Sequence, residues 1–588
     1  MRDPLTISRR KHHMRILLLV SAFNGLSQRT WRVLREAGHD VGVLLASTES
    51  EIIDGVRAAM PDLIVCPYLK DRVPAEVWRH WRTVIVHPGP VGDRGPSSLD
   101  WAISEGVPRW GVTALQAVEE MDAGPVWATR TFAMPPDVPR KSTLYNGPVA
   151  DAALHCILEV VAKATDPTFV PVPAEMMPTE IPGARLRPLM RQTDRCFDWG
   201  QPSQDIIRAI RAADGSPGVR TSVAGLDVYA YDAHPGPPVP ASAGTLLHHR
   251  QGALLVATGD GSVWLGHLRL APTSAGPAGV KLPAADVLGS RLAGIPEGPV
   301  DVDADSGLLY QQVRYRRTGS IGWVQFDFYN GAMAPSHCLR LRNALRYAAA
   351  QDTEVLVLVS GDDVFSNGIH LNMIHAAADP AAAAWANIRA INEVCREILC
   401  CTGQTVIAGY AGSAGAGGVM MGLGADIVAA RDGIVLNPYY DIGLYGSELH
   451  TLTLPRRVGG ATARRLLTEK LPLSAEYARS IGLVDQVGPR DPSAYRTWLT
   501  DLAEWHASQP ESWNLDGRKY PAPGHEELPS DAYETRELAE MSYDMFADRS
   551  GFAAARLAFV AKAKPTHTPE RLKLSSARTA EQNVMATT

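Results

Sequence analysis

The stretch Gly412-Ser-Ala-Gly-Ala-Gly-Gly-Val-Met-Met-Gly-Leu-Gly-Ala-Asp426 decides the fold of the second half of the chain. It follows an apolar run, Thr405 to Ala408, that is typical of a strand, and it leads into a helix of small residues. Glycine has no Cβ, so the backbone here can approach a ligand closely. The first N–H groups of a helix have no partner inside the helix and can point at a developing negative oxygen.

A second run of the same kind lies upstream. Val355-Leu-Val-Leu-Val359 is typical of a buried strand, and the loop Phe365-Ser-Asn-Gly-Ile-His-Leu371 follows it. Two strand-to-loop junctions that each offer one backbone N–H can form an oxyanion hole, which we expect to hold a thioester carbonyl. A glycine-rich run alone is more often explained by close helix packing. The two runs together, in this order and spacing, favour the oxyanion hole.

The segment from Val302 to Val487 resembles the crotonase (enoyl-CoA hydratase/isomerase) superfamily. Besides the two runs above, it carries a late motif of that superfamily. The motif comprises Arg457-Val-Gly459, Arg464-Arg-Leu-Leu-Thr468, Ala478 and Gly482-Leu-Val-Asp-Gln-Val487. The resemblance implies a spiral of strand–helix turns that binds a coenzyme A thioester. It also implies that the oxyanion hole consists of the N–H groups of Asn367 and Gly417.

Hydratases of this superfamily add water with two glutamates, and this sequence has neither. The corresponding positions hold Met420 and Tyr439. A thioether cannot move a proton. We therefore expect no water addition and predict different acid–base groups at this site.

The segment Asn437-Pro-Tyr-Tyr-Asp-Ile-Gly-Leu-Tyr-Gly-Ser-Glu448 supplies the candidates. We predict that Tyr439 or Tyr440 acts together with Glu448. A tyrosine can donate a proton to a leaving thiolate, and a buried carboxylate with a raised pKa can accept one. The alternative is a Tyr–Glu hydrogen bond that only closes a loop. Asp441 and Tyr445 are lesser candidates.

Bulk properties set the class of protein. The 588 residues suggest about three or four domains. An apolar fraction of 45% and a charged fraction of 20% are ordinary for a globular protein. The net charge of -6 means that the chain has no excess of basic residues to bind a polyanion, so we expect no nucleic-acid partner. No segment approaches the ~20 apolar residues of a membrane helix, so we expect no membrane partner either.

The cysteines and the N-terminus bear on location. The seven cysteines are dispersed without CxxC or Cys/His spacing, so we expect reduced thiols, a cytoplasmic protein and no metal site. Ser8-Arg-Arg-Lys11 before the apolar run Ile16–Phe23 only faintly resembles an export signal. We expect a disordered leader over residues 1–13 and a folded part that begins at Met14.

Residues 14–185 alternate short apolar runs with amphipathic stretches, which predicts a Rossmann-like α/β domain with a parallel, doubly wound sheet. The predicted strands are Arg15–Val20, Val41–Leu45, Leu63–Cys66 and Thr83–Val86, and the predicted helices are Gln28–Glu36 and Glu51–Ala59. His87 directly follows the last of these strands, and ligands of such sheets bind beyond the carboxyl ends of the strands. A histidine with a carboxylate can shuttle a proton. A purely structural His–Asp pair is the alternative.

The segment from Met14 to Leu270 resembles the formyltransferases that use 10-formyltetrahydrofolate. In that family a His-Pro pair after a strand is followed by Arg-Gly and then by Asp-x-Gly-Pro. His87-Pro88, Arg94-Gly95 and Asp122-Ala-Gly-Pro125 match these motifs in order. The resemblance implies that His87 and Asp122 are the catalytic pair.

The same resemblance implies a folate pocket. Its expected lining residues are Asp71, Arg72, Val73, Glu119, Met121 and Asp122. One position departs from the family, because the amine-formylating members carry Asn two residues before the histidine and this chain has Ile85. Transfer to an ordinary amine is therefore in doubt, and transfer to another acceptor remains open.

Short apolar runs with turn spacing in residues 186–271 predict a small β domain. It resembles the C-terminal OB-like barrel of methionyl-tRNA formyltransferase, without the basic surface that tRNA binding needs. Residues 272–301 are rich in Pro, Gly, Ala and Ser and are predicted to be a linker. We expect the crotonase-like domain over residues 302–510 and a C-terminal helical extension over residues 511–588.

The fusion of the two halves resembles the HypX (HoxX) family of hydrogenase maturation factors over nearly the full length. The run from His87 without the Asn, and Gly443-Leu-Tyr-Gly-Ser-Glu448, match that family rather than either parent family. The resemblance implies formyl transfer from 10-formyltetrahydrofolate to coenzyme A, and then cleavage of formyl-CoA to carbon monoxide and coenzyme A. It also implies hydrogenase maturation proteins as possible partners. The alternatives are a formyl-folate hydrolase fused to an unrelated acyl-CoA enzyme, and a non-catalytic maturation chaperone.

Overall fold

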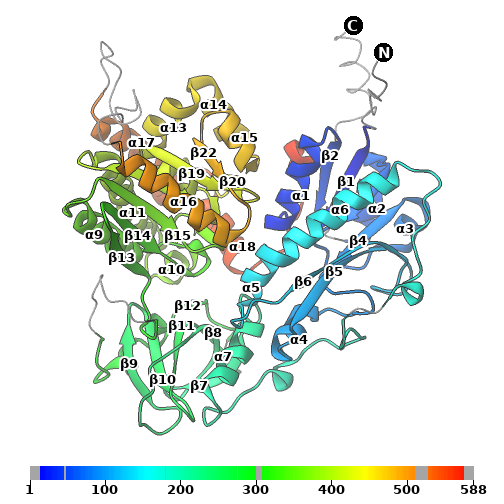
Figure 1. Cartoon of the computed structure of the whole chain (residues 1–588), viewed down its shortest axis with the longest axis horizontal. Helices are drawn as coiled ribbons and strands as arrows, with labels where there is room; N and C mark the ends of the chain where they lie inside the picture. The colour runs from blue at the N-terminus through cyan, green and yellow to red at the C-terminus, as the bar shows by residue number, and fades with distance from the viewer. Residues whose placement is uncertain are drawn as a thin grey trace. The chain divides into compact units, whose positions relative to one another are not determined.

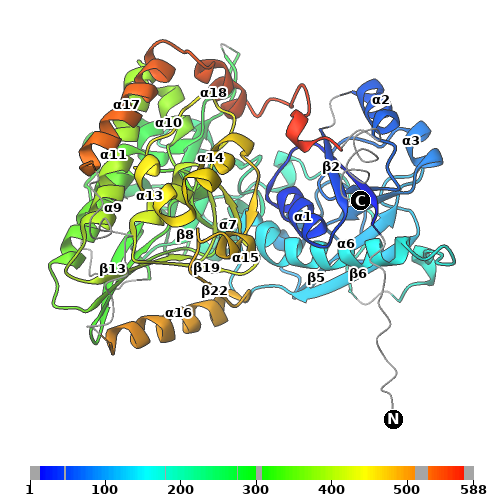
Figure 2. The same ribbon diagram turned by 90° about the horizontal axis from the view of Figure 1, so that it is seen from above.

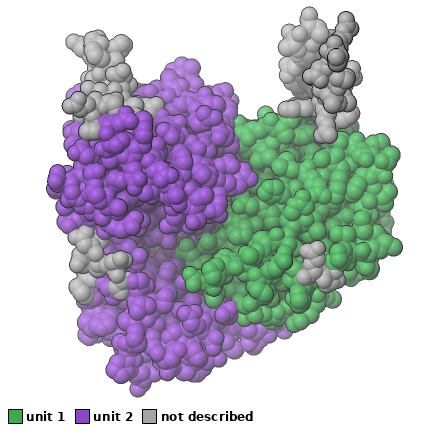
Figure 3. Space-filling view, viewed as in Figure 1, with its two compact units in different colours: residues 1–190, 564–588 green, residues 191–563 purple. Residues whose placement is uncertain are grey.

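The structure is a computed structural model that describes residues 13–45, 48–178, 181–274, 276–298, 307–509 and 528–574. The chain divides into two compact units, coloured separately in Figure 3. The first comprises residues 1–190 together with 564–588, and the second comprises residues 191–563. Residues 1–12 of the expected leader and residues 511–527 and 575–588 of the expected C-terminal extension lie outside the described residues.

The first unit is built on a six-stranded sheet in the order β2-β1-β3-β4-β5-β6. Its strands are β1 (Arg15–Val20), β2 (Asp40–Leu45), β3 (Leu63–Cys66), β4 (Thr83–His87), β5 (Arg109–Gln116) and β6 (Val126–Ala133). The first four pair in parallel, as predicted. The sheet also contains β5 and β6, for which no strand was predicted, and β5 pairs antiparallel with both β4 and β6. The short connection from β5 to β6 contains no helix that could cross over the sheet. Neighbouring strands joined by such a short connection pair antiparallel.

Helices cover this sheet. They are α1 (Gly25–Glu36), α2 (Glu49–Ala59), α3 (Ala75–His80), α4 (Ser98–Ser104), α5 (Lys141–Leu144) and α6 (Ala150–Ala164). The side chains of Asn24 and Thr48 cap the N-termini of α1 and α2, which fixes where these helices begin. Helix α6 runs across β5 and β6, as Figure 1 shows.

The small β domain opens the second unit. Its strands β7 (Val219–Val223), β8 (Leu226–Pro235), β9 (Leu246–Arg250), β10 (Ala253–Ala257), β11 (Ser262–Leu270) and β12 (Leu282–Pro283) pair antiparallel. The sheet order is β7-β8-β11-β10-β9, with β12 beside β11.

The prediction of a barrel is wrong, because this sheet does not close. Helices α7 (Ser203–Ala212) and α8 (Ala284–Leu288) contribute buried side chains to the core on one face of the sheet. The core is therefore sealed by helices rather than by closure of the sheet. Ala224 and Gly225 both have positive φ, 49° and 74°, and form the tight turn that joins β7 to β8.

The crotonase-like part has two sheets. The larger has the order β13-β14-β15-β17-β19-β22 and the smaller β16-β18-β20-β21. The larger comprises β13 (Val313–Thr318), β14 (Ile321–Phe326), β15 (Val355–Ser360), β17 (Thr405–Tyr410), β19 (Ile427–Arg431) and β22 (Gln486–Gly488). The smaller comprises β16 (Val364–Ser366), β18 (Ser413–Gly415), β20 (Val435–Asn437) and β21 (Leu473–Ser474).

Long helices pack around these sheets. They include α9 (Pro335–Ala349), α11 (Pro380–Cys400), α13 (His450–Val458), α14 (Gly460–Glu469) and α16 (Pro492–Ala507). The glycine-rich stretch becomes β18 followed by the short helix α12 (Gly417–Met421). Helices α17 (Ser530–Phe546) and α18 (Phe552–Val560) end the unit, and α17 lies alongside α11 (Figure 2). Among the described residues, no helix is both long and apolar enough to cross a bilayer.

Candidate functional sites

The two glycine-containing loops meet in the second unit, as the sequence predicts. Strands β16 and β18 are parallel neighbours, so the loops that follow them start at the same edge of the small sheet. A Cβ on Gly368, which has φ +75°, would lie 3.2 Å from the backbone nitrogen of Gly417. Two backbones that approach this closely require glycine at the contact. The backbones of these two loops therefore form the basis of the site.

One of the two predicted oxyanion-hole donors needs correction. The N–H of Asn367 donates to the carbonyl of Gly331 at 2.7 Å, so it is already used within the fold. Two residues further on, the N–H of Ile369 makes no hydrogen bond with any residue that the structure describes, and the same holds for Gly417. The sequence located the loop. Which of its N–H groups stays available depends on the distant Gly331, so no local signal could have shown it.

The three predicted acid–base residues lie close to Gly417. The carboxylate of Glu448 accepts hydrogen bonds from the hydroxyl of Tyr439 and from the N–H of Ser447, both at 2.9 Å. A Cβ on Gly417 would overlap an oxygen of that carboxylate. The hydroxyl of Tyr440 faces Gly415 in the same way. The structure therefore brings Glu448 and both tyrosines to the glycine-rich loop.

Burial changes the proton affinity of this pair. Desolvation raises the pKa of Glu448 to about 7, although the hydrogen bond from Tyr439 acts in the opposite direction. Desolvation and the nearby negative charge of Glu448 raise the pKa of Tyr439 well above its ordinary value. At neutral pH the tyrosine therefore holds its proton while the carboxyl exchanges one. That is the division of roles that a proton donor and a proton acceptor need.

The lesser candidates are placed differently. Asp441 forms an ion pair with Lys470 at 3.0 Å. Tyr445 is 37% exposed, and its ring lies against His450 with the centroids 5.5 Å apart. Met420 is 1% exposed and belongs to the hydrophobic core. The position of a hydratase glutamate is thus filled by a core side chain.

Glu537, which the sequence reasoning missed, fixes the segment that carries Glu448. This fully buried carboxylate of α17 accepts from the N–H groups of Leu449 and Thr451 at 3.0 and 2.7 Å, and from the hydroxyl of Ser447 at 3.2 Å. It thereby satisfies N–H groups at the start of α13. Glu448 and Leu449 have positive φ, 63° and 56°, which is costly for residues with a Cβ. The carboxylate of Glu537 holds this strained backbone in place.

A methyl group at Gly417 tests the importance of this arrangement. We expect Gly417→Ala to lower the rate of the crotonase-like site by about a hundredfold, because a misplacement of 1 Å can cost that much. The new methyl would displace the carboxylate of Glu448, which is held by two hydrogen bonds. Gly403→Ala is the matched control, since a Cβ there meets no atom within 4 Å. Turnover of an acyl-CoA substrate measures both, and an equal effect of the two changes would contradict this account.

The second candidate site lies in the first unit, at the end of β4. His87 is buried, and its Nε2 lies 2.9 Å from Oδ2 of Asp93. Its Nδ1 lies 3.6 Å from Oδ2 of Asp122, which also accepts from the N–H of Gly95 at 3.2 Å. The predicted pair of His87 and Asp122 is thus brought together. Asp93 was missed, although it stands only six residues after the histidine.

The backbone around His87 explains two features of the sequence. Gly89 packs against the pair, because a Cβ there would collide with Oδ2 of Asp93 and lie 2.6 Å from Nε2 of His87. Ile85 pairs with Leu115 in the sheet and is half-buried. It brings no amide to the place where the amine-formylating enzymes have one.

The residues expected to bind folate fall into two groups. Arg72 donates to the carbonyl of Glu119 and so fixes the loop that leads to Asp122, while Met121 on that loop is 54% exposed. The other two are occupied within the first unit. The carboxylate of Asp71 pairs with Lys564 at 2.8 Å, and Val73 is buried in the core.

Comparison with known proteins agrees with this double architecture. Residues 321–569 match the family model for enoyl-CoA hydratase/isomerase, and residues 189–277 match the model for the C-terminal domain of formyl transferase. The chain is 35% identical over 205 residues to methionyl-tRNA formyltransferase of Roseiflexus castenholzii, which covers 34% of this chain and 61% of that protein.

One relative matches both parts at once. Hydrogenase maturation factor HoxX of Bradyrhizobium diazoefficiens is 40% identical over 561 residues, which is 95% of this chain and 96% of that protein. The chain belongs to the HypX/HoxX family of hydrogenase maturation factors. A crystal structure of a HypX variant from Aquifex aeolicus, 36% identical, superposes with a TM-score of 0.90 over 95% of this chain and 98% of that one. HypX from Aquifex aeolicus in complex with tetrahydrofolic acid gives a TM-score of 0.86 over the same shares.

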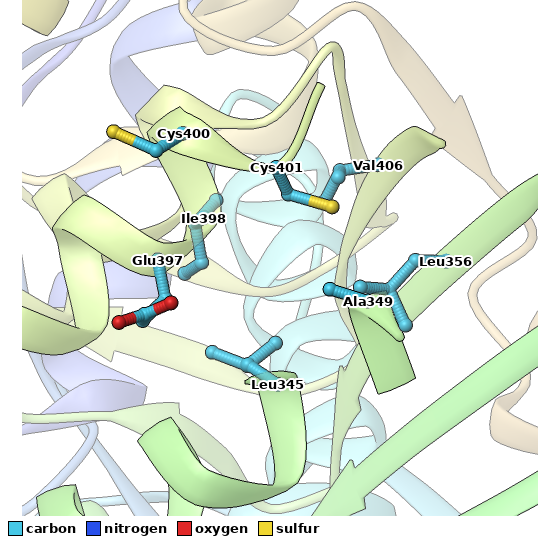
Figure 4. Close-up of a pocket in the computed structure, with 8 residues that line it drawn as sticks. All are labelled: Leu345, Ala349, Leu356, Glu397, Ile398, Cys400, Cys401 and Val406. Atoms are coloured by element: carbon cyan, nitrogen blue, oxygen red, sulfur yellow. The ribbon is translucent and has the colours of Figure 1, made fainter. Parts of the chain in front are cut away.

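This HypX/HoxX chain also contains a cavity of about 90 Å³ in the second unit (Figure 4). It lies between α9, α11 and the strands β15 and β17, and most of its lining is apolar, including Leu345, Leu356, Ile398 and Val406. None of the candidate site residues lines it. Within the described ranges, no group of three or more His, Cys, Asp and Glu side chains is arranged to hold a metal ion.

Proposed function

We propose that this chain makes carbon monoxide for the assembly of a [NiFe]-hydrogenase active site. The first unit transfers a formyl group from 10-formyltetrahydrofolate to the thiol of coenzyme A. The crotonase-like part then splits formyl-CoA into carbon monoxide and coenzyme A. The observation that carries this proposal is the buried Tyr439–Glu448 pair beside Gly417, with Met420 where a hydratase holds a glutamate.

The first step is acyl transfer to sulfur. The thiol sulfur attacks the formyl carbon, a C–S bond forms, and the bond from that carbon to N10 of the folate breaks. His87 accepts the thiol proton and returns one to N10, and Asp122 lies 3.6 Å from the imidazole to stabilise its charged form. Ile85 supplies no amide to polarise the formyl group through its oxygen. A strong nucleophile suits such a site, and a thiolate is a stronger nucleophile than a neutral thiol.

Folate binding is supported in two ways. A relative that matches 95% of this chain has been crystallised with tetrahydrofolic acid. In this chain, the contact of Arg72 with the carbonyl of Glu119 gives the loop before Asp122 a fixed main chain. Fixed backbone donors and acceptors are suited to the hydrogen-bonding edge of a pterin.

The second step removes a proton from the formyl carbon and expels the thiolate. We infer that the N–H groups of Ile369 and Gly417 hold the thioester oxygen, and that the ionised Glu448 takes the formyl proton. The C–S bond breaks, carbon monoxide leaves, and Tyr439 or Tyr440 protonates the thiolate. The proton on Glu448 then restores the tyrosine. Atoms and electrons balance without any oxidant or reductant, because formyl-CoA has the composition of carbon monoxide plus coenzyme A.

One experiment decides between this proposal and its rivals. Purified protein is incubated with 10-formyltetrahydrofolate labelled with ¹³C at the formyl carbon and with coenzyme A, and each substrate is omitted in turn. We expect labelled carbon monoxide in the headspace only when both substrates are present. Labelled formate without carbon monoxide would favour a formyl-folate hydrolase fused to a separate acyl-CoA enzyme. No turnover of either substrate would favour a non-catalytic maturation chaperone.

A further inference from the structure

The imidazole of His87 lies between two carboxylates that hold it unequally. Asp93 is at hydrogen-bond distance from Nε2, 2.9 Å, whereas Asp122 is 3.6 Å from Nδ1. A carboxylate can only accept a hydrogen bond, so the proton in the short contact with ionised Asp93 belongs to Nε2. The second nitrogen, Nδ1, is then the one with a lone pair when the imidazole is neutral. The two contacts therefore define which nitrogen can act as a base.

Asp93 and His87 also depend on each other energetically. The side chain of Asp93 is 1% exposed, and its Oδ1 has no hydrogen-bond partner among the described residues. An isolated buried carboxylate is costly. His87 supplies the hydrogen bond to Asp93, and the buried guanidinium of Arg187 also acts on this carboxylate electrostatically. The turn that places Asp93 is fixed by its own N–H, which donates to Pro90, and by Gly89, which leaves room for the pair. The local sequence is thus arranged around this contact.

We propose that Asp93 is a positioning residue for formyl transfer, which keeps the proton of His87 on Nε2 and leaves Nδ1 to take the proton of the thiol. This inference rests on the proposed function. It assigns the orienting role to Asp93 and leaves Asp122, at the looser contact, beside the nitrogen that reacts. After proton uptake the imidazolium lies between two carboxylates, which stabilises its charge until the proton passes to N10 of the folate.

Two variants test the role of Asp93. In Asp93→Asn the amide can donate to Nε2, which moves the imidazole proton to Nδ1, and Asp93→Leu removes the acceptor while it keeps the branching of the side chain. We expect either change to lower kcat for formyl transfer by about 10²- to 10⁴-fold with little change in KM for the folate. Carbon monoxide release from supplied formyl-CoA should stay unchanged. Asp62→Asn is the matched control, because Asp62 directly precedes β3, at the opposite end of the parallel strands from His87, and accepts from the N–H of Arg15.

Nitrogen NMR gives a readout that a merely structural role would not move. The ¹⁵N shifts of His87, assigned by difference from His87→Gln, should show the proton on Nε2 in the wild type and a loss of that tautomer in both variants. Wild-type rates in both variants, or an unchanged tautomer in both, would overturn the assignment of Asp93. If the wild type itself transfers no formyl group to coenzyme A, the proposed function fails instead, so the two failures are distinguishable.

Discussion

Glu448→Gln is expected to abolish carbon monoxide release from formyl-CoA while leaving formyl transfer from the folate intact. Glutamine keeps the size of the side chain and can still accept from Tyr439, but it cannot take a proton. General base catalysis typically contributes about 10²- to 10⁴-fold, so the loss should be at least of that order. Headspace analysis with supplied formyl-CoA measures it. Glu476→Gln, which alters an exposed carboxylate paired with Arg479, is the matched control.

The pH dependence provides an independent check on Glu448. Burial raises the pKa of this carboxyl from 4.5 to about 7, so the rate of carbon monoxide release in the wild type should rise with pH through an inflection near 7.

The contribution of Glu448 to protein stability should fall as the pH rises. Above pH 4.5 the carboxyl of Glu448 loses its proton in the unfolded chain but keeps it in the folded protein. The free energy of unfolding therefore falls as the pH rises from 4.5 to about 7. Glu448→Gln should therefore be at least as stable as the wild type at pH 8. A less stable variant would point to a structural role.

His87→Gln is expected to produce the complementary defect. It removes the group that carries the thiol proton, so carbon monoxide formation from 10-formyltetrahydrofolate and coenzyme A should fall by about 10²- to 10⁴-fold. Release from supplied formyl-CoA should proceed at the wild-type rate, because His87 and Glu448 belong to different units. His80→Gln is the control, since its imidazole is exposed on α3 of the same unit. If His87→Gln stopped both reactions equally, two separate sites would not describe this enzyme.

The chain's periodic patterns gave most of the secondary structure. Apolar runs of four to six residues placed β1, β3, β15 and β17 because a buried strand needs nothing but apolar side chains on both faces. The antiparallel strands β5 and β6 were not predicted, and the small β sheet is open where a barrel was predicted. The pairing of strands and the closure of a sheet both depend on which elements pack together, and local hydrophobicity does not determine that. The turn between β7 and β8 depends on Ala224, and an alanine gives no sign in the sequence that its φ is positive.

The sequence by itself determined the residue types of both sites: a histidine after a buried strand, a carboxylate in Asp-x-Gly-Pro, glycines at two loops, and Tyr439, Tyr440 and Glu448 in place of the water-adding pair. Only the tertiary structure decided which groups support or block them. Gly331 takes up the N–H of Asn367, Asp93 fixes one nitrogen of His87, and Glu537 holds the segment of Glu448 from 89 residues away along the chain. A side chain's chemistry is local and can be read in sequence, whereas its hydrogen-bond partner and its exposure to water are set by the packing of distant elements.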